Sequence, residues 1–101
     1  MTPWHPITDP SDLKRLGKLA EEAGELCSAV SRCIIQGINA REPTTDKSNE
    51  TWLEEEIADV LANIELTVDH FTLDKTYIRE RIELKLGLLR AWHKAEARGR
   101  T

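Results

Sequence analysis

Two pairs of acidic residues have a spacing that suits metal binding. Glu22 and Glu25 lie three residues apart in one apolar-periodic segment, and Glu56 and Asp59 repeat that spacing in another. Residues three apart project from one face of a helix, so each pair would present two carboxylates together. Carboxylate oxygens are ligands for hard cations, which bind the phosphates of a substrate. The pattern therefore predicts a Mg²⁺ site, or a Mn²⁺ site, shared by two helices.

The apolar pattern predicts three helices to carry these residues. The first begins at Asp9-Pro10, an N-cap followed by a first-turn proline, and ends near Gly37. A loop at 38–49 leads to the second helix, which ends in a break around 72–74. The third helix follows and ends in a basic tail at 95–101.

The fold class predicted by these segments is all-α, since no stretch of useful length alternates with a period of two. The 101 residues suit a single domain, 1–101, with an N-terminal arm at 1–8. A chain of this size buries only roughly 60 to 70% of its surface on folding. We therefore expect an antiparallel helical bundle that is completed by oligomerisation, as a homodimer or homotetramer.

Charge and hydropathy limit the possible partners. The formal net charge of −4 argues against a general nucleic-acid binder. The sequence has no run of about 18 uncharged apolar residues for a membrane span, and its N-terminus does not resemble a secretion signal. We expect a cytoplasmic protein with no nucleic-acid or membrane partner. A divalent cation would offset the repulsion between this acidic chain and a phosphorylated ligand.

Helical geometry places both acid pairs beside the apolar stripes of their helices. At about 100° per residue, Glu22 falls next to the edge formed by Leu26 and Cys33, with Glu25 roughly 60° farther out. Antiparallel packing would bring the four carboxylates together, and their repulsion would call for a cation. The alternative is a solvated acidic face, because the chain has 18 acidic residues and one such pair is weak evidence.

The acid pairs and their neighbours resemble the MazG-like, all-α nucleoside triphosphate pyrophosphohydrolases. The similar pattern is Glu-Glu-x-x-Glu at 21–25 followed by Glu-x-x-Asp at 56–59, with flanking matches from Lys18 and after Asp59. The resemblance covers about residues 13–92. It implies hydrolysis of a nucleotide between its α and β phosphates, which releases a nucleoside monophosphate and pyrophosphate.

The resemblance also implies roles for individual acids. The implied Mg²⁺ ligands are Glu22, Glu25, Glu56 and Asp59. Glu21 would support these ligands or position the attacking water. Carboxylate-held Mg²⁺ suits this reaction because it neutralises phosphate oxygens and activates water without a protein nucleophile.

Cations of the third helix are the expected phosphate contacts. Lys85 falls within an apolar arc, where a cation is costly unless it pairs with an acid or reaches a ligand. The family often carries a Lys followed five residues later by Arg, matched here by Lys85 and Arg90, and Arg81 lies beside Lys85. Leu89 occupies a position where the family often has Asn, so recognition of the base or sugar stays open.

Two residues of the second helix are expected to contact the substrate. Trp52 and Asn63 share a strip with Glu56 and Asp59, and an aromatic face or an amide suits a nucleobase. The 30-residue interval between Glu25 and Glu56 is long for the family and predicts a longer loop near the site.

The predicted function is a Mg²⁺-dependent nucleoside or deoxynucleoside triphosphate pyrophosphohydrolase. The phosphoribosyl-ATP pyrophosphohydrolases share a similar acidic run, but they usually carry Tyr-His where this chain has Ala62-Asn63. A noncatalytic helical oligomerisation module with solvated acids is the alternative from a different class.

Overall fold

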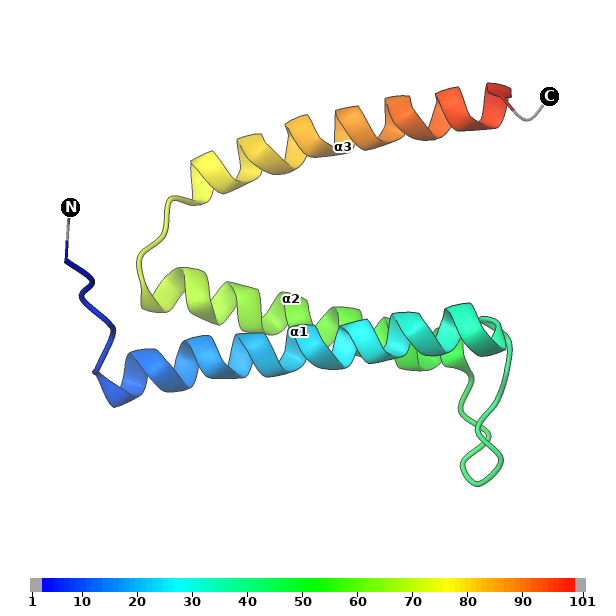
Figure 1. Ribbon diagram of the computed structural model, residues 1–101, viewed down its shortest axis with the longest axis horizontal. Coiled ribbons are helices and arrows are strands. Elements are labelled where there is room, and N and C mark those ends of the chain that lie inside the picture. Colours follow the sequence, from blue (N-terminus) through cyan, green and yellow to red (C-terminus); the bar gives the residue numbers. More distant parts are fainter. Residues whose placement is uncertain (1–2, 100–101) are drawn as a thin grey trace. The chain divides into compact units, whose positions relative to one another are not determined.

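The computed structural model describes residues 3–99, which form three helices and no strand (Figure 1). The helices are α1 (Pro10–Gln36), α2 (Asn49–His70) and α3 (Lys75–Gly99). The predicted all-α fold class is confirmed. Over residues 3–99, no helix combines the length and apolarity that crossing a bilayer requires.

Helix α1 begins and ends where its sequence signals predict. The Asp9 carboxylate accepts a hydrogen bond from the Asp12 backbone N–H at 3.0 Å, and Pro10 occupies the first turn. Gly37 follows the helix with a φ of 93°, a backbone region that favours glycine, and its N–H donates to the Cys33 carbonyl. The single glycine therefore ends the helix.

Helix α2 begins one residue earlier than predicted. The Ser48 hydroxyl accepts from the Thr51 backbone N–H at 3.1 Å, so Ser48 is the N-cap and Asn49 is the first helical residue. The predicted loop at 38–49 was therefore too long by one residue at its end. Ser48 and Asn49 are both good capping residues, and Asn49 is used for a different contact.

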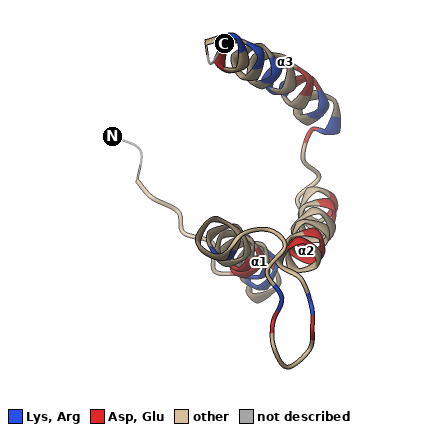
Figure 2. Ribbon diagram, turned by 90° about the vertical axis from the view of Figure 1, so that its right-hand side faces the viewer, with Lys and Arg blue, Asp and Glu red and all other residues tan. Residues whose placement is uncertain are grey.

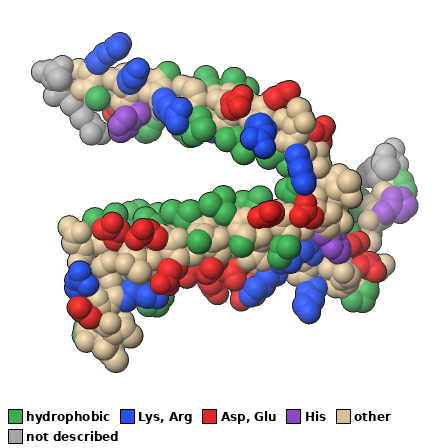
Figure 3. Space-filling model, turned by 180° about the vertical axis from the view of Figure 1, so that it is seen from behind, with side chains coloured by type: hydrophobic (Ala, Val, Ile, Leu, Met, Phe, Trp, Pro, Cys, Tyr) green, Lys and Arg blue, Asp and Glu red, His purple; other side chains and the backbone are tan. Residues whose placement is uncertain are grey.

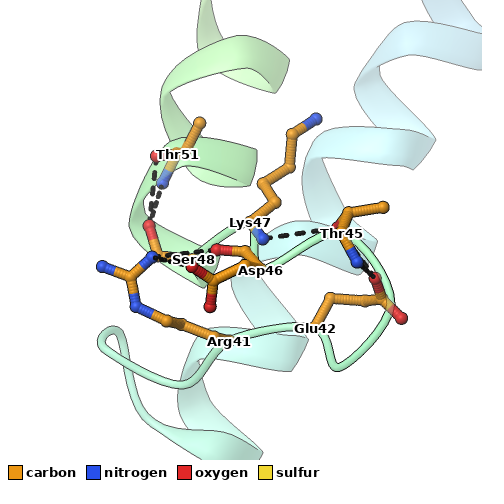
Figure 4. Close-up of polar contacts among 7 residues, drawn as sticks. All are labelled: Arg41, Glu42, Thr45, Asp46, Lys47, Ser48 and Thr51. Carbon is orange, nitrogen blue, oxygen red and sulfur yellow. Dashed lines mark hydrogen bonds and ion pairs between the residues drawn. The ribbon is translucent and has the colours of Figure 1, made fainter.

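The connection between α1 and α2 is held by local polar contacts (Figure 4). The Glu42 carboxylate accepts from the Thr45 hydroxyl at 2.7 Å and from the Thr45 backbone N–H. These hydrogen bonds lower the pKa of Glu42. The Arg41 guanidinium donates to the Asp46 carbonyl at 2.8 Å, and an isolated bridge pairs Arg41 with Ser48. The long connection is therefore an organised turn.

Contacts at both ends fix α1 and α2 as an antiparallel helix hairpin, residues 10–70. At one end the buried Asn49 side chain donates to the Gly37 carbonyl at 2.9 Å and to Gln36 Oε1 at 3.2 Å. At the other end His70 Nε2 lies 2.7 Å from Asp12 Oδ1. The two contacts set the axial register of one helix against the other.

The hairpin has almost no apolar core. Ala29 is the one buried hydrophobic residue within 3–99, and the other buried residues are Glu22, Asn49 and Thr67. Hydrophobic side chains instead form a band along one edge of the hairpin (Figure 3). Exposed apolar residues of the hairpin include Leu13, Leu16, Val30, Ile34, Ile57, Leu61 and Ile64.

The chain divides into two compact units between Phe71 and Thr72. The hairpin belongs to the first unit and α3 to the second, and the expectation of a single domain stays a prediction. The Asp74 carboxylate accepts from the Tyr77 N–H at 2.9 Å at the start of α3, which has no buried residue along its described length. The helix continues through most of the predicted basic tail, and residues 1–2 of the predicted arm and 100–101 of that tail lie outside the described residues.

Candidate metal centre

Carboxylates from both helices of the hairpin meet in a small acid cluster, Glu22, Glu56 and Asp59. Each residue contributes one oxygen, and these oxygens all lie within 4.8 Å of one another. Figure 2 shows acidic residues on both α1 and α2. The structure therefore brings together three of the four predicted ligands, one from the first pair and both from the second.

Two oxygens of the acid cluster are buried without a hydrogen-bond partner. Glu22 is only 8% exposed, and its Oε2 contacts no donor. Oε2 of the half-buried Glu56 is also without a donor. A buried anionic oxygen with no partner is costly because it has lost its hydration. Both oxygens are thus suited to bind a cation.

Glu25, the fourth predicted ligand, lies at the margin of the acid cluster. Its pKa is raised, chiefly by the charge on Glu22, then by partial loss of hydration and by the charge on Glu56. The shift shows that Glu25 belongs to the same electrostatic group although it is more exposed. Proton uptake or a bound cation would relieve the repulsion.

The donor set fits a hard cation of small size. Oxygens bound to one Mg²⁺ at about 2.1 Å can lie no farther apart than about 4.2 Å, the distance across an octahedron. The 4.8 Å limit for the three oxygens is close to that distance, so small side-chain rotations would let one ion contact all three. The cluster offers oxygen atoms alone, which favours Mg²⁺ or Mn²⁺ over softer metals.

The ammonium group of Lys18 places a positive charge beside the acid cluster. Its Nζ lies 3.2 Å from Glu22 Oε1 and 3.4 Å from Glu21 Oε1. Hydrogen bonding to Glu22, and then to Glu21, raises the pKa of Lys18. Glu21 is exposed and pairs with Lys18, so the predicted supporting acid lies at the edge of the site rather than within the acid cluster.

Trp52 lies beside the acid cluster and lines a cavity together with Glu56, and its predicted contact with a substrate stays a prediction. The Arg32 guanidinium carbon and Lys47 Nζ lie 4.7 and 4.6 Å from the centroid of the indole ring. The indole Nε1 is buried without an acceptor. The ring lines a cavity of about 290 Å³, and we name this cavity the Trp52 cavity; its lining residues are Glu25, Ser28, Ala29, Arg32, Trp52 and Glu56.

Both the oxygen and the nitrogen of the Asn63 side-chain amide form hydrogen bonds. Its Oδ1 accepts from Arg15 Nη2 at 2.6 Å, and its Nδ2 donates to the Asp59 carbonyl at 2.8 Å. The structure therefore links Asn63 to the backbone of a cluster residue and to Arg15. Its predicted contact with a substrate stays a prediction.

A basic pocket lies on the other side of the acid cluster and was missed by sequence reasoning. This pocket has a volume of about 650 Å³, and its lining residues are Ser11, Lys14, Arg15, Gly17, Lys18, Glu21 and His70. The sequence signal was the basic spacing of Lys14, Arg15 and Lys18 on one helix. The pocket was not predicted because the prediction used the acidic residues alone.

The predicted phosphate contacts of the third helix lie in the second unit. Arg81, Lys85 and Arg90 are all exposed on α3. The alternative, in which Lys85 pairs with an acid of the first helix, stays a prediction because that helix belongs to the other unit. Its contact with a triphosphate stays a prediction.

Comparison of the chain with protein-family models, with curated proteins and with solved structures finds no match.

Proposed function

We propose that the chain is a Mg²⁺-dependent pyrophosphohydrolase of nucleoside or deoxynucleoside triphosphates. The observation that carries this proposal is the acid cluster, whose three oxygens lie within 4.8 Å of one another and include residues with buried, unpartnered oxygens. The resemblance of both acidic motifs to the MazG-like pattern supplies the class of reaction. In this proposal Glu22, Glu25, Glu56 and Asp59 hold the metal ion.

The proposed reaction transfers a nucleotidyl group to water. The bound Mg²⁺ would supply charge neutralisation on the phosphate oxygens and a lower pKa for water. The water oxygen bonds to the α phosphorus, and the bond from that phosphorus to the oxygen bridging to the β-phosphate breaks. Pyrophosphate leaves with the electron pair, and the proton of the water passes to solvent. Glu21 would support the metal ligands or position the attacking water.

Oligomerisation of the helices is part of the same proposal. The band of exposed apolar residues on the hairpin and the unburied length of α3 support a bundle of the all-α pyrophosphatase type completed by further copies of the chain, as a homodimer or homotetramer. In such a bundle Arg81, Lys85 and Arg90 would contribute phosphate contacts. Analytical ultracentrifugation of the purified protein would test it, and a monomer at all concentrations would contradict it.

The decisive experiment measures both products from a panel of canonical and modified nucleoside triphosphates with Mg²⁺, then with Mn²⁺. Glu56→Gln and Asp59→Asn should each lower kcat/KM at least about a hundredfold, because each removes a ligand charge. Glu54→Gln is the matched control, since Glu54 is exposed and lies outside the acid cluster. No hydrolysis of any nucleotide, or full activity in both variants, would contradict the proposal.

A noncatalytic oligomerisation module is the second candidate, and the exposed apolar band favours it. Such a module gives no reason for two buried carboxylate oxygens to lack partners. It predicts that Glu56→Gln changes stability but removes no metal binding, which isothermal titration with Mg²⁺ would show.

A further inference from the structure

Four buried side-chain atoms lack a hydrogen-bond partner within residues 3–99, and all four belong to the helices of the hairpin. Two are acceptors, Glu22 Oε2 and Glu56 Oε2, and two are donors, Arg15 Nε and Trp52 Nε1. Buried polar atoms are almost always paired, so each exception calls for an explanation. A single ligand that satisfied all four would have to present a cation to the acceptors and acceptor atoms to the donors.

The four atoms follow an order along the hairpin. Arg15 bonds to Asn63, which lies seven residues beyond Glu56 on α2, or about 10 Å at 1.5 Å per residue. Trp52 lies four residues on the other side of Glu56, or about 6 Å away. The two donors therefore flank the acceptors over roughly 16 Å of α2, which requires an elongated ligand with its cation in the middle.

The two ends of this line differ in chemistry. The basic pocket at the Arg15 end also contains Lys14, which has no ion-pair partner among the described residues, and Lys18, which would keep only its exposed partner Glu21 once a metal ion binds Glu22. Clustered cations of this kind suit phosphate oxygens. The Trp52 cavity at the other end presents an aromatic ring, Ala29 and the Ser28 hydroxyl, which suit a flat heterocycle.

We infer that the nucleotide lies lengthwise along the hairpin, with its β- and γ-phosphates in the basic pocket and its base in the Trp52 cavity. This inference rests on the proposed function and adds an orientation and a pyrophosphate subsite to it. The α-phosphate then lies at the acid cluster, the pyrophosphate departs into the pocket of Lys14, Arg15 and Lys18, and the indole N–H donates to an acceptor atom of the base.

The test measures the two products separately by isothermal titration of the full chain in Mg²⁺. The probes are inorganic pyrophosphate and the four ribonucleoside monophosphates. Lys14→Gln should weaken pyrophosphate binding about tenfold, the effect of one charge-assisted contact, and leave monophosphate binding unchanged. Trp52→Phe keeps an aromatic ring but removes the N–H donor, and it should weaken monophosphate binding alone.

Arg79→Gln is the control for the loss of one exposed positive charge, and it should change neither affinity. Thermal unfolding of each variant verifies that it is folded. The orientation would be overturned if each variant weakened the binding of both products equally, or if Lys14→Gln weakened monophosphate binding and Trp52→Phe weakened pyrophosphate binding. Loss of pyrophosphate binding in Lys85→Met but not in Lys14→Gln would overturn it as well. Selective effects without hydrolysis of any triphosphate would overturn the proposed function alone, and no Mg²⁺-dependent binding of either product would overturn both.

Discussion

Lys18 Nζ lies 3.2 Å from Glu22 Oε1, so the most buried carboxylate of the acid cluster is already paired with an ammonium group. A metal ion that binds Glu22 must compete with this ammonium. In the proposed metal site, this pair would lower the affinity for a free metal ion. A bound metal ion would leave Lys18 paired with Glu21 alone, beside the basic pocket.

Removal of this competing charge should strengthen metal binding. We expect Lys18→Gln to raise the affinity for Mg²⁺ without nucleotide by a factor of about three to ten, because a nearby positive charge repels the ion. Isothermal titration at fixed ionic strength measures it, with Arg79→Gln as the control. An unchanged affinity would show that Lys18 and the metal ion do not compete.

Neutralisation of one acid should stabilise the metal-free protein. Glu56→Gln replaces an anionic oxygen by an amide group whose N–H can donate to Glu22 Oε2, and we expect the free energy of unfolding to rise by about 1 to 3 kcal/mol. Urea denaturation in EDTA measures the change, with Glu54→Gln as the control. A variant that is less stable than the wild type would mean that Glu56 is already satisfied.

Metal binding should stabilise the wild-type protein. Mg²⁺ at a hundred times its Kd would add about 2.7 kcal/mol, which for a domain of this size raises Tm by roughly 10 °C or more. Thermal unfolding with Mg²⁺, then with EDTA, measures the shift. Because salt also screens repulsion, NaCl at equal ionic strength is the control. Equal shifts in both salts would indicate screening without a metal site.

The raised pKa of Glu25 gives the metal-free protein a particular pH dependence. The folded protein takes up a proton on Glu25 more readily than the unfolded chain, whose reference value is 4.5. Stability should therefore fall as the pH rises from 4.5 through the raised folded pKa. Unfolding in EDTA at several pH values measures the slope, and Glu25→Gln should flatten it. Mg²⁺ affinity should change in the opposite sense and weaken as the pH falls, because protonation removes a ligand.

The end contact at Asn49 should contribute to stability. Asn49→Ala removes the hydrogen bonds that the buried Asn49 amide donates to Gly37 and Gln36, so we expect a loss of about 1 to 3 kcal/mol. Chemical denaturation measures the loss. Glu50→Gln, on the neighbouring exposed residue, should change stability by less than about 0.5 kcal/mol. An unaffected Asn49→Ala variant would mean that water replaces the lost bonds.

Helix boundaries were predictable where one residue carries the signal. Asp9-Pro10 and Gly37 act through their own caps and backbone geometry, so the ends of α1 follow from local sequence. At the start of α2 two capping residues stand together, and the tertiary bond from Asn49 to Gly37 decides between them. Local propensity contains no information about such a bond.

The site was predictable to the extent that it depends on helical periodicity. The seam positions of Glu22, Glu56 and Asp59 follow from their spacing to apolar residues, and the structure brings these three together. The bond between Arg15 and Asn63 joins residues 48 positions apart and depends on the register of two helices. A single sequence does not contain that register, which is why the contact of Arg15 with Asn63 was missed, while the role of Asn63 as a substrate contact stays a prediction.

The polar contacts at the two ends of the hairpin have a consequence for the chemistry between them. With so small an apolar core, the Asn49, His70 and Arg15–Asn63 contacts oppose sliding of α2 along α1. A slip by one helical turn would move Glu56 about 5.4 Å, farther than a carboxylate can compensate by rotation. In the proposed site, metal affinity should thus respond to substitution of Asn49, about 10 Å along α2 from Glu56, and of His70, roughly 16 Å from Asp59, although neither residue would touch the ion.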